Sequence, residues 1–276
     1  TVLQRALEKA ELTPEDLDYI LAGDLLNQCI GSSFGLRDFR VPFYGLYGAC
    51  STMGESLSLA SLLIDGGYAD RAAALTSSHF CTAERQYRMP VPYGSQRTPT
   101  AQWTATAAGC TILGSDGPGP YVTHVTCGRI VDKGITDANN MGAAMAPAAY
   151  DTLSAFFRDT GYRPADFDLI ITGDLGELGH DIVRDFFRRD GVDLGPQFQD
   201  CGLLLYDRKH QDMHAGASGC GCSASVLNGY LLTEMRRGKW KNILFAPTGA
   251  LLSPTSSFQG ESVPGICHVV QISMKK

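Results

Sequence analysis

The sequence has no long hydrophobic run, no cluster of basic residues and no segment that resembles a secretion signal. Its longest apolar stretches, such as residues 57–64, are interrupted by serines and fall far short of the roughly 20 residues that span a bilayer. Lysine and arginine total 23 against 29 acidic residues, a net charge of −6, so nothing is available to neutralise a phosphate backbone. We therefore expect a cytoplasmic protein without nucleic-acid binding, associated with membranes only peripherally or through partners.

The sequence also lacks the paired cysteine spacing of a disulfide framework or a zinc site. Its nine cysteines are an odd number and often follow Gly or Ala, as in Ala49-Cys50 and Gly219-Cys220-Gly221-Cys222. Such placement is typical of small buried thiols in a reducing compartment. No run has the pattern of an EF-hand calcium loop. Neither a disulfide nor a metal site is expected.

An internal repeat divides the chain. Residues 11–26 read ELTPEDLDYILAGDLL and residues 161–176 read GYRPADFDLIITGDLG, with seven identities in register. A second pair of segments begins with Cys-Ser at residues 50 and 222, and each reaches a glycine sixteen residues after its cysteine. The repeat predicts two similar halves, residues 1–117 and residues 121–276, joined by the turn-forming sequence GPGP.

Each half alternates helical and strand patterns, which is typical of an α/β fold. Helices are expected over residues 2–10, 151–159 and after Cys50, and strands over residues 17–22, 42–47, 71–75, 121–130 and 167–172. The helix after Cys50 is apolar around most of its circumference, so we expect it between two sheets. The strand over residues 121–130 opens the second half and has no counterpart in the first half. We expect the matching strand to lie upstream, outside this sequence.

Two tandem βαβαβ halves, with a cysteine entering a buried helix, resemble the thiolase and ketoacyl-synthase superfamily. Within it, the chain resembles the stage V sporulation protein AD family over nearly its whole length. The strings that carry this resemblance are LAGDLLNQ (21–28), GACST (48–52), LIDGGYA (63–69), TSSH (76–79), TAERQYR (82–88), GRIVDKGITD (128–137), MGAAMAPAA (141–149), ITGDL (171–175), DCGLLLYD (200–207), GASGCGCSA (216–224) and TGALLSPTS (248–256). The resemblance implies a five-layer αβαβα thiolase-like fold in which the first half lacks its N-terminal strand.

The same resemblance implies a function. It describes a soluble subunit of a sporulation membrane complex at the spore inner membrane, which moves dipicolinic acid into the developing spore. The ligand would be bound without catalysis, either free or as its calcium chelate, so that calcium would enter only with it. The resemblance further implies a homodimer that pairs sheet edges of the first half.

The residues themselves leave two interpretations of Cys50 open. At the start of a helix, the dipole and free amide groups favour a thiolate or a bound anion, so a site role is favoured over the alternative of a small buried thiol. A condensing enzyme acting on an acyl-CoA thioester would need basic partners for Cys50, and the candidates are His214 and His268. The thiolase pattern places Pro after its histidine and glycines after its last cysteine, whereas here Ala215 follows His214 and His268 follows Cys267. These departures favour binding over acyl transfer, and a purely structural subunit is a third possibility.

Specificity is predicted in the segment that follows the strand over residues 71–75. Ser77, Ser78 and His79 lie at the carboxyl edge of that strand, where open α/β sheets bind ligands. Arg85 and Arg88 would share a helix face and suit a planar molecule with two carboxylates; a solvated face balanced by Glu84 is the alternative. The full predicted ligand-binding set is Cys50, Ser77, Ser78, His79, Arg85, Arg88, His214 and His268.

Two aspartates, Asp24 and Asp174, occupy the same place in both copies of the repeat. A shared structural task, such as bonding loop amides, is favoured for them over calcium ligation.

Overall fold

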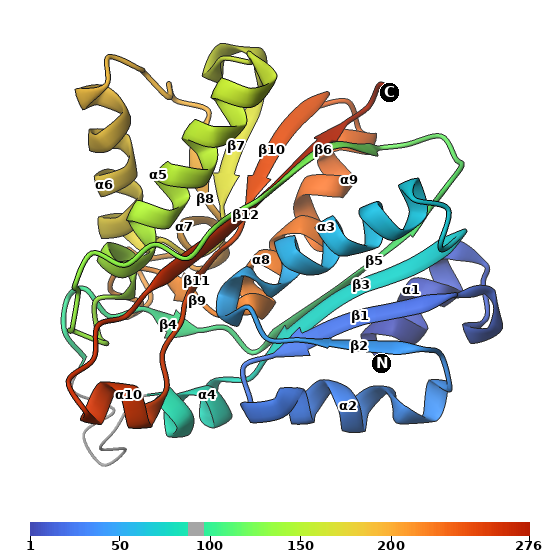
Figure 1. Cartoon of the computed structure of the whole chain (residues 1–276), viewed down its shortest axis with the longest axis horizontal. Helices are drawn as coiled ribbons and strands as arrows, with labels where there is room; N and C mark the ends of the chain where they lie inside the picture. Colours follow the sequence, from blue (N-terminus) through green and yellow to red (C-terminus); the bar gives the residue numbers. More distant parts are fainter. Residues whose placement is uncertain (88–96) are drawn as a thin grey trace.

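The computed structural model describes residues 1–87 and 97–276, and its framework is two mixed β-sheets (Figure 1). In the first sheet three strands run parallel and the fourth is antiparallel to its neighbour. The strands in spatial order are β2 (Phe43–Leu46), β1 (Tyr19–Asp24), β3 (Arg71–Ser78) and β5 (Ala107–Gly114). All of them belong to the first predicted half.

The second sheet repeats this order with the residues of the second half. Its main path is β8 (Phe198–Asp200), β7 (Leu169–Thr172), β10 (Asn242–Ala246), β12 (Gly265–Ser273) and β11 (Thr248–Ala250). The antiparallel step from β10 to β12 matches the step from β3 to β5, which confirms the repeat. In addition β6 (Tyr121–Cys127) pairs with β12. A short pair, β4 (Trp103–Thr104) with β9 (Ala217–Ser218), links the two halves.

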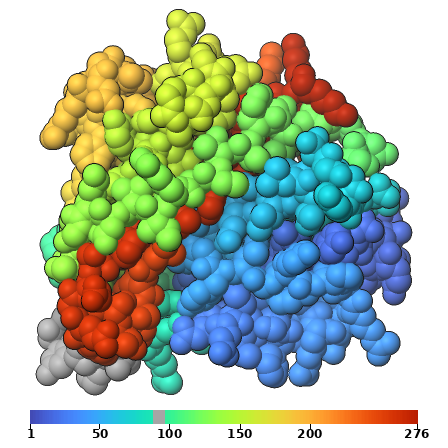
Figure 2. Space-filling view, viewed as in Figure 1, coloured from blue at the N-terminus to red at the C-terminus, as the bar shows by residue number. Residues whose placement is uncertain are grey.

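Helices form three layers around the two sheets, so the predicted five-layer arrangement is confirmed (Figure 1). The central layer holds α3 (Thr52–Asp65) and a second helix that runs through α8 (Cys220–Val226), a π-helical stretch (Leu227–Leu231) and α9 (Leu232–Arg236). The outer layers hold α1 (Val2–Ala10) on the first sheet and α5 (Met141–Thr160) with α6 (Gly176–Arg189) on the second. Figure 2 shows the first half in blue to teal and the second in green to red, meeting across one face.

Four shorter helices lie at the periphery: α2 (Ile30–Leu36), α4 (Phe80–Tyr87), α7 (Cys201–Leu205) and α10 (Pro254–Phe258). Within the described residues no helix combines the length and apolar character needed to cross a membrane.

The central layer is buried because its helices carry small and apolar residues on several faces. Met53 and Leu57 of α3 are fully buried between the sheets. A Cβ atom at Gly54 would approach the His268 carbonyl oxygen to 3.2 Å, so glycine permits α3 to lie close to β12. The predicted burial of this helix between two sheets is therefore confirmed.

Three predicted boundaries are wrong by three residues or more. Strand β3 continues to Ser78 rather than ending at residue 75, so Ser77 and Ser78 lie within the strand. Helix α5 begins at Met141, ten residues before the expected start at Asp151, and it contains Pro147. Its added turns are rich in small residues that pack tightly: a Cβ at Gly142 would lie 2.5 Å from the Leu175 carbonyl oxygen. Strand β6 ends at Cys127 rather than at residue 130.

Candidate functional site

Cys50 lies in a 3-10 turn (Ala49–Ser51) between β2 and α3, as the sequence predicted. The turn is held by its own hydroxyls, because Ser51 Oγ donates to the Gly48 carbonyl at 2.6 Å and Thr52 Oγ1 donates to the Ala49 carbonyl at 2.7 Å. Cys50 is only 6% exposed. Its thiol therefore lies at the start of the central helix but is shielded from solvent.

Asp174, which follows β7, interacts with this thiol from the second half. Its carboxylate accepts hydrogen bonds from the Gly219 amide at 2.9 Å, from Ser218 Oγ at 3.2 Å and from Thr248 Oγ1 at 3.3 Å. Burial raises the pKa of Asp174 to about 6, although the Cys50 thiol and the Gly219 amide act in the opposite direction. The pair is the central feature of the site.

Burial also raises the pKa of the Cys50 thiol well above its usual range, and the negative charge of Asp174 raises it further. The sequence predicted that the helix N-terminus would favour a thiolate. In the structure the loss of hydration and the adjacent carboxylate outweigh the helix dipole, so the protonated thiol is the stable form.

A second buried carboxylate, Asp200, supports the loop that carries Asp174. It accepts hydrogen bonds from Thr172 Oγ1 at 2.7 Å, from the Leu175 amide at 2.9 Å and from the Gly176 amide at 3.2 Å. Burial raises the pKa of Asp200 as well. Asp200 therefore acts on the site through the loop that carries Asp174.

Helix α4 closes the site from outside. Ala83 and Tyr87 pack around Cys50 together with Leu25 and Cys220. The Tyr87 hydroxyl donates to the Leu25 carbonyl at 2.6 Å and also bonds the Tyr47 hydroxyl. Burial raises the pKa of the Tyr87 phenol, so this hydroxyl is uncharged.

A further hydrogen bond ties α4 to the loop after β1: Gln86 Nε2 donates to Asn27 Oδ1 at 2.7 Å. This bond fixes α4 over the loop that carries Asn27.

The two predicted histidine partners bond other groups. His214 is half-buried at the surface, where Nδ1 lies 2.7 Å from the Thr98 carbonyl oxygen and Nε2 lies 2.9 Å from Asp212 Oδ1. His268 is buried in β12, and its Nδ1 accepts from the Gly128 amide at 3.4 Å; burial lowers its pKa. Neither imidazole is among the groups that shift the pKa of the Cys50 thiol.

The residues of the predicted specificity segment do not lie together at one site: some are buried between the halves and others are exposed. Ser78 is buried and joins the two halves, because its Oγ donates to the Ala105 carbonyl at 2.6 Å and accepts from the Gly221 amide at 3.0 Å. The Ser77 carbonyl accepts from the Cys220 thiol. His79 and Arg85 are exposed.

Arg85 lies on the face of α4 opposite to Ala83 and Tyr87, because residues two apart on a helix point to opposite sides. Arg88, its predicted partner, lies outside the described residues.

The structural task predicted for the repeated aspartates is confirmed by their hydrogen bonds to loop amides. Asp24 accepts from the Leu26 amide at 2.8 Å and from the Ser32 amide at 2.6 Å, as Asp174 accepts from Gly219. What sequence reasoning missed is the contact between Asp174 and Cys50. The sequence could have predicted this contact, because an aspartate at the end of a buried strand lies at the sheet edge that faces the cysteine turn.

Two cavities are described, and neither is lined by Cys50. One of about 760 Å³ borders β5, and the other, of about 520 Å³, lies between residues 129–133 and helices α5 and α6. In the described ranges, no three His, Cys, Asp or Glu side chains are grouped so that they could hold a metal ion.

Comparisons with known proteins agree on one family. The family model described as stage V sporulation protein AD matches residues 1–273. The stage V sporulation protein AD of Bacillus subtilis (strain 168) is 47% identical over 266 residues, which are 96% of this chain and 78% of that protein.

Solved structures with the same fold include condensing enzymes. The 3-oxoacyl-(acyl carrier protein) synthase III of Pseudomonas aeruginosa PAO1 has a TM-score of 0.62 at 13% identity, covering 100% of this chain and 81% of that one. A variant of OleA from Xanthomonas campestris with cerulenin has a TM-score of 0.63 at 11% identity, covering 99% and 77%. At such low identity these likenesses establish the thiolase-like fold alone.

Proposed function

The chain belongs to the stage V sporulation protein AD family, and from this premise we propose that it serves sporulation by binding dipicolinic acid on a condensing-enzyme fold that no longer transforms its ligand. In this role it acts as a subunit of a membrane complex that moves dipicolinate into the spore. It works on the cytoplasmic side, attached to the spore inner membrane through partner subunits.

The proposal that the ligand is bound without catalysis rests on one observation, the pairing of Cys50 with the Asp174 carboxylate. Acyl transfer from a thioester needs a thiolate, or a thiol with a base that takes its proton. Here burial and Asp174 both raise the pKa of Cys50, and the imidazoles of His214 and His268 bond other groups. The structure therefore supports holding a ligand rather than attacking one.

The neutral polar groups of α4 and its neighbour Tyr47 also support the binding proposal. Tyr47, Tyr87 and Gln86 present neutral hydroxyl and amide groups above the thiol, and such groups donate hydrogen bonds to carboxylates without the cost of a buried charge. In this proposal these donors bond the carboxylates of the ligand, while the exposed Arg85 supplies a cation at the outer face of α4. A planar dicarboxylate fits this combination.

Calorimetric titration with dipicolinate, with and without calcium, tests the binding. Heat and a rise in the thermal unfolding midpoint are expected at ligand concentrations up to about 1 mM, which corresponds to roughly −4 kcal/mol of binding free energy. Benzene-1,3-dicarboxylate, which lacks the ring nitrogen, and pyridine-2-carboxylate, which lacks one carboxylate, are the matched ligands and should bind more weakly. The Cys50→Ala variant should still bind, because no covalent bond is involved. Absence of heat with dipicolinate in either buffer would remove the proposal.

A condensing enzyme is the second candidate, favoured by the fold and by the position of Cys50 at the start of α3. Incubation with acetyl-CoA followed by mass spectrometry separates the two. An acyl adduct on Cys50 that disappears in Cys50→Ala would establish acyl transfer, whereas the binding proposal expects no adduct.

A further inference from the structure

The fold gathers basic side chains at one end of the second half, although the sequence was expected to lack a basic cluster. Residues 236–241 read RRGKWK and residues 275–276 read KK. The two segments meet because β10 and β12 are paired, and the Met274 amide donates to the Lys241 carbonyl at 2.8 Å. Together they supply six exposed cations, which we call the basic patch: Arg236, Arg237, Lys239, Lys241, Lys275 and Lys276.

The basic patch is positive in a chain whose net charge is −6. It contains four of the seven lysines in the sequence. Two carboxylates, Glu234 and Asp168, contact it, and two more, Asp65 and Asp116, line the larger cavity beside it. Six cations against these four carboxylates leave a surplus of two positive charges, so the patch attracts anions although the whole chain repels them.

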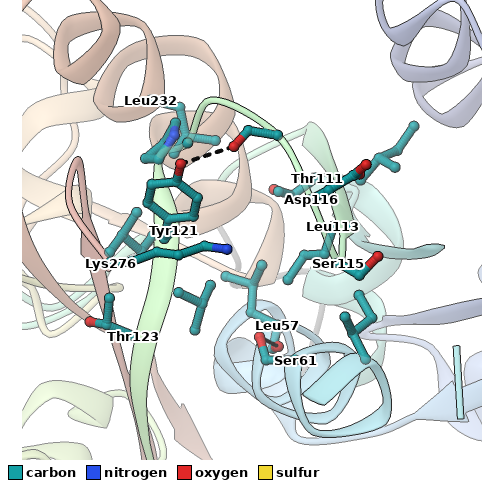
Figure 3. A pocket seen from close by; sticks show the side chains of 18 of the residues that line it. Leu57, Ser61, Thr111, Leu113, Ser115, Asp116, Tyr121, Thr123, Leu232 and Lys276 are labelled. Atoms are coloured by element: carbon teal, nitrogen blue, oxygen red, sulfur yellow. Dashed lines mark hydrogen bonds between the residues drawn. The ribbon is translucent and has the colours of Figure 1, made fainter. Parts of the chain in front are cut away.

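Aromatic rings lie directly beside these cations. Trp240 and Tyr230 meet edge to face with their ring centroids 5.6 Å apart. Lys239 Nζ lies 4.5 Å from the Trp240 centroid and donates to the Tyr230 hydroxyl at 2.8 Å. Figure 3 shows Lys276 in a similar relation to Tyr121, with its Nζ 5.3 Å from the ring centroid. Aromatic rings with a polar edge, flanked by lysine and arginine, are the side chains that favour the interface between lipid and water.

The outward part of the basic patch is a turn rather than a pocket. Residues 237–241 connect α9 to β10, and none of them lines either described cavity. Such a surface cannot enclose a small anion. It fits a partner whose negative charges are spread over an area, as they are in a layer of anionic headgroups.

The position of the patch leaves the Cys50 site accessible. Strands β7 and β10 are parallel, and the patch precedes the first residue of β10, whereas Asp174 follows the last residue of β7. The patch and the site therefore lie at opposite ends of the second sheet. A protein that is docked through the patch keeps the carboxyl edge of this sheet away from the docking surface.

We propose that the basic patch docks this protein directly onto an anionic lipid bilayer. Its cations lie against the phosphate headgroups, and Tyr230 and Trp240 lie in the interfacial layer. This contact is additional to any attachment through partner subunits and does not depend on the binding of dipicolinate.

Sedimentation with sucrose-loaded vesicles tests the inference. Vesicles of phosphatidylcholine with phosphatidylglycerol are compared with vesicles of phosphatidylcholine alone, at about 0.1 M and about 0.5 M NaCl and without dipicolinate. The variant combines Lys241→Gln with Lys275→Gln, because these two ammonium groups have no hydrogen-bond or ion-pair partner among the described residues. The control combines Lys133→Gln with Lys209→Gln, which removes the same charge from exposed lysines outside the basic patch.

The anionic vesicles should bind the unmodified chain about tenfold or more tightly than the neutral ones at the lower salt concentration. Binding should weaken at the higher concentration, where the Debye length is about 4 Å. Each lysine near an anionic surface contributes about fivefold, so the double variant should bind about 25-fold more weakly, and the control should change by less than about twofold.

Equal binding to both kinds of vesicle would overturn the inference, and so would an equal loss of binding in the variant and the control. Soluble polyglutamate is the third probe. If it binds with the same dependence on Lys241 and Lys275 while the vesicles do not bind, the patch fits an acidic protein segment and the lipid inference is wrong. Because dipicolinate is absent from this assay, its failure is distinct from a failure of the proposed ligand binding.

Discussion

The site depends on one contact between residues of different halves, that of Asp174 with Cys50. A cysteine at a helix N-terminus is ordinarily made more acidic by the helix dipole. Here Cys50 is buried and lies against a carboxylate, and both raise its pKa. Desolvation and a like charge act over a few ångströms without water to screen them, so they exceed the dipole contribution. The protonated thiol is therefore the stable form of Cys50.

Alkylation with iodoacetamide compares the reactivity of Cys50 with that of the exposed cysteines. Cys81 and Cys127 are exposed, whereas Cys50 is buried, and the reactive thiolate falls about tenfold for each unit by which the pKa exceeds the pH. At pH 7.5 we expect peptides with Cys81 and Cys127 to be modified at least about tenfold faster than the peptide with Cys50. Equal rates would show that Cys50 is an activated thiol.

Replacing Asp174 by asparagine tests the charge itself. The folded-state pKa of Asp174 is raised from 3.8 to about 6, so the folded protein holds a proton that the unfolded chain releases between those values. The stability that this group contributes is therefore fully present below about pH 4 and is lost as pH rises to 6. The loss is at most about 3 kcal/mol.

Urea unfolding at pH 4.5, 5.5 and 6.5 follows this effect. In Asp174→Asn the decline in the free energy of unfolding across this range should be smaller than in the unmodified protein, and Cys50 should be alkylated faster because a negative neighbour is gone. An identical pH profile for both proteins would contradict the raised pKa.

At the level of elements, the order of helices and strands could be predicted from the sequence because both copies of the internal repeat show the same pattern. Helix α1 and the turn at Cys50 were predicted where they lie, since periodicity and a cysteine after a strand mark them locally. The start of α5 was not, because Pro147 ordinarily ends a helix, and only the packing of Gly142 against α6 explains the longer element. The position of α4 over the site could not be predicted either, because it depends on a contact between Tyr47 and Tyr87, which are 40 positions apart.

Close packing between elements gives a sharp prediction at Gly109. A Cβ atom at this position in β5 would lie 2.3 Å from the Ala224 carbonyl oxygen of α8, so Gly109→Ala must push the central helix away from the sheet. We expect a loss of about 2 kcal/mol or more in the free energy of unfolding.

Gly35→Ala is the matched control. Gly35 lies inside α2, where an added Cβ meets nothing within 4 Å, so alanine should be neutral or stabilising by about 0.5 kcal/mol. Thermal unfolding of both variants measures the difference, and equal midpoints would show that β5 and α8 are not in close contact.

For the whole molecule, the site exists only because two copies of one unit face each other. Cys50 comes from the first half and Asp174 from the second, and Ser78 of the first half bonds the Gly221 amide of the second. The sequence indicated the duplication, but the contacts between halves join residues more than 100 positions apart and follow from packing alone. This explains why Asp174 was assigned only its loop-bonding task, and why its interaction with Cys50 was not predicted.

The outer edge of the first sheet supports the homodimer expected from the sequence, which remains a prediction. Strand β2 is at this edge, and Phe43 and Tyr44 on it are 39% and 51% exposed, next to Phe34 of α2 at 61%. A free strand edge with an apolar surface around it favours pairing with a second copy, in which two β2 strands meet antiparallel about a two-fold axis.

Light scattering at about 10 μM should give twice the chain mass of 29.7 kDa. Tyr44→Lys places a charge at the centre of this interface, and since a few buried aromatic side chains carry most of the binding energy in such contacts, the dissociation constant should rise by about tenfold or more. Tyr68→Lys is the control, because Tyr68 is 73% exposed on the turn between α3 and β3, outside the patch. If both lysine variants dissociate alike, or if the unmodified chain is already a monomer at this concentration, then β2 is not the edge by which two copies associate.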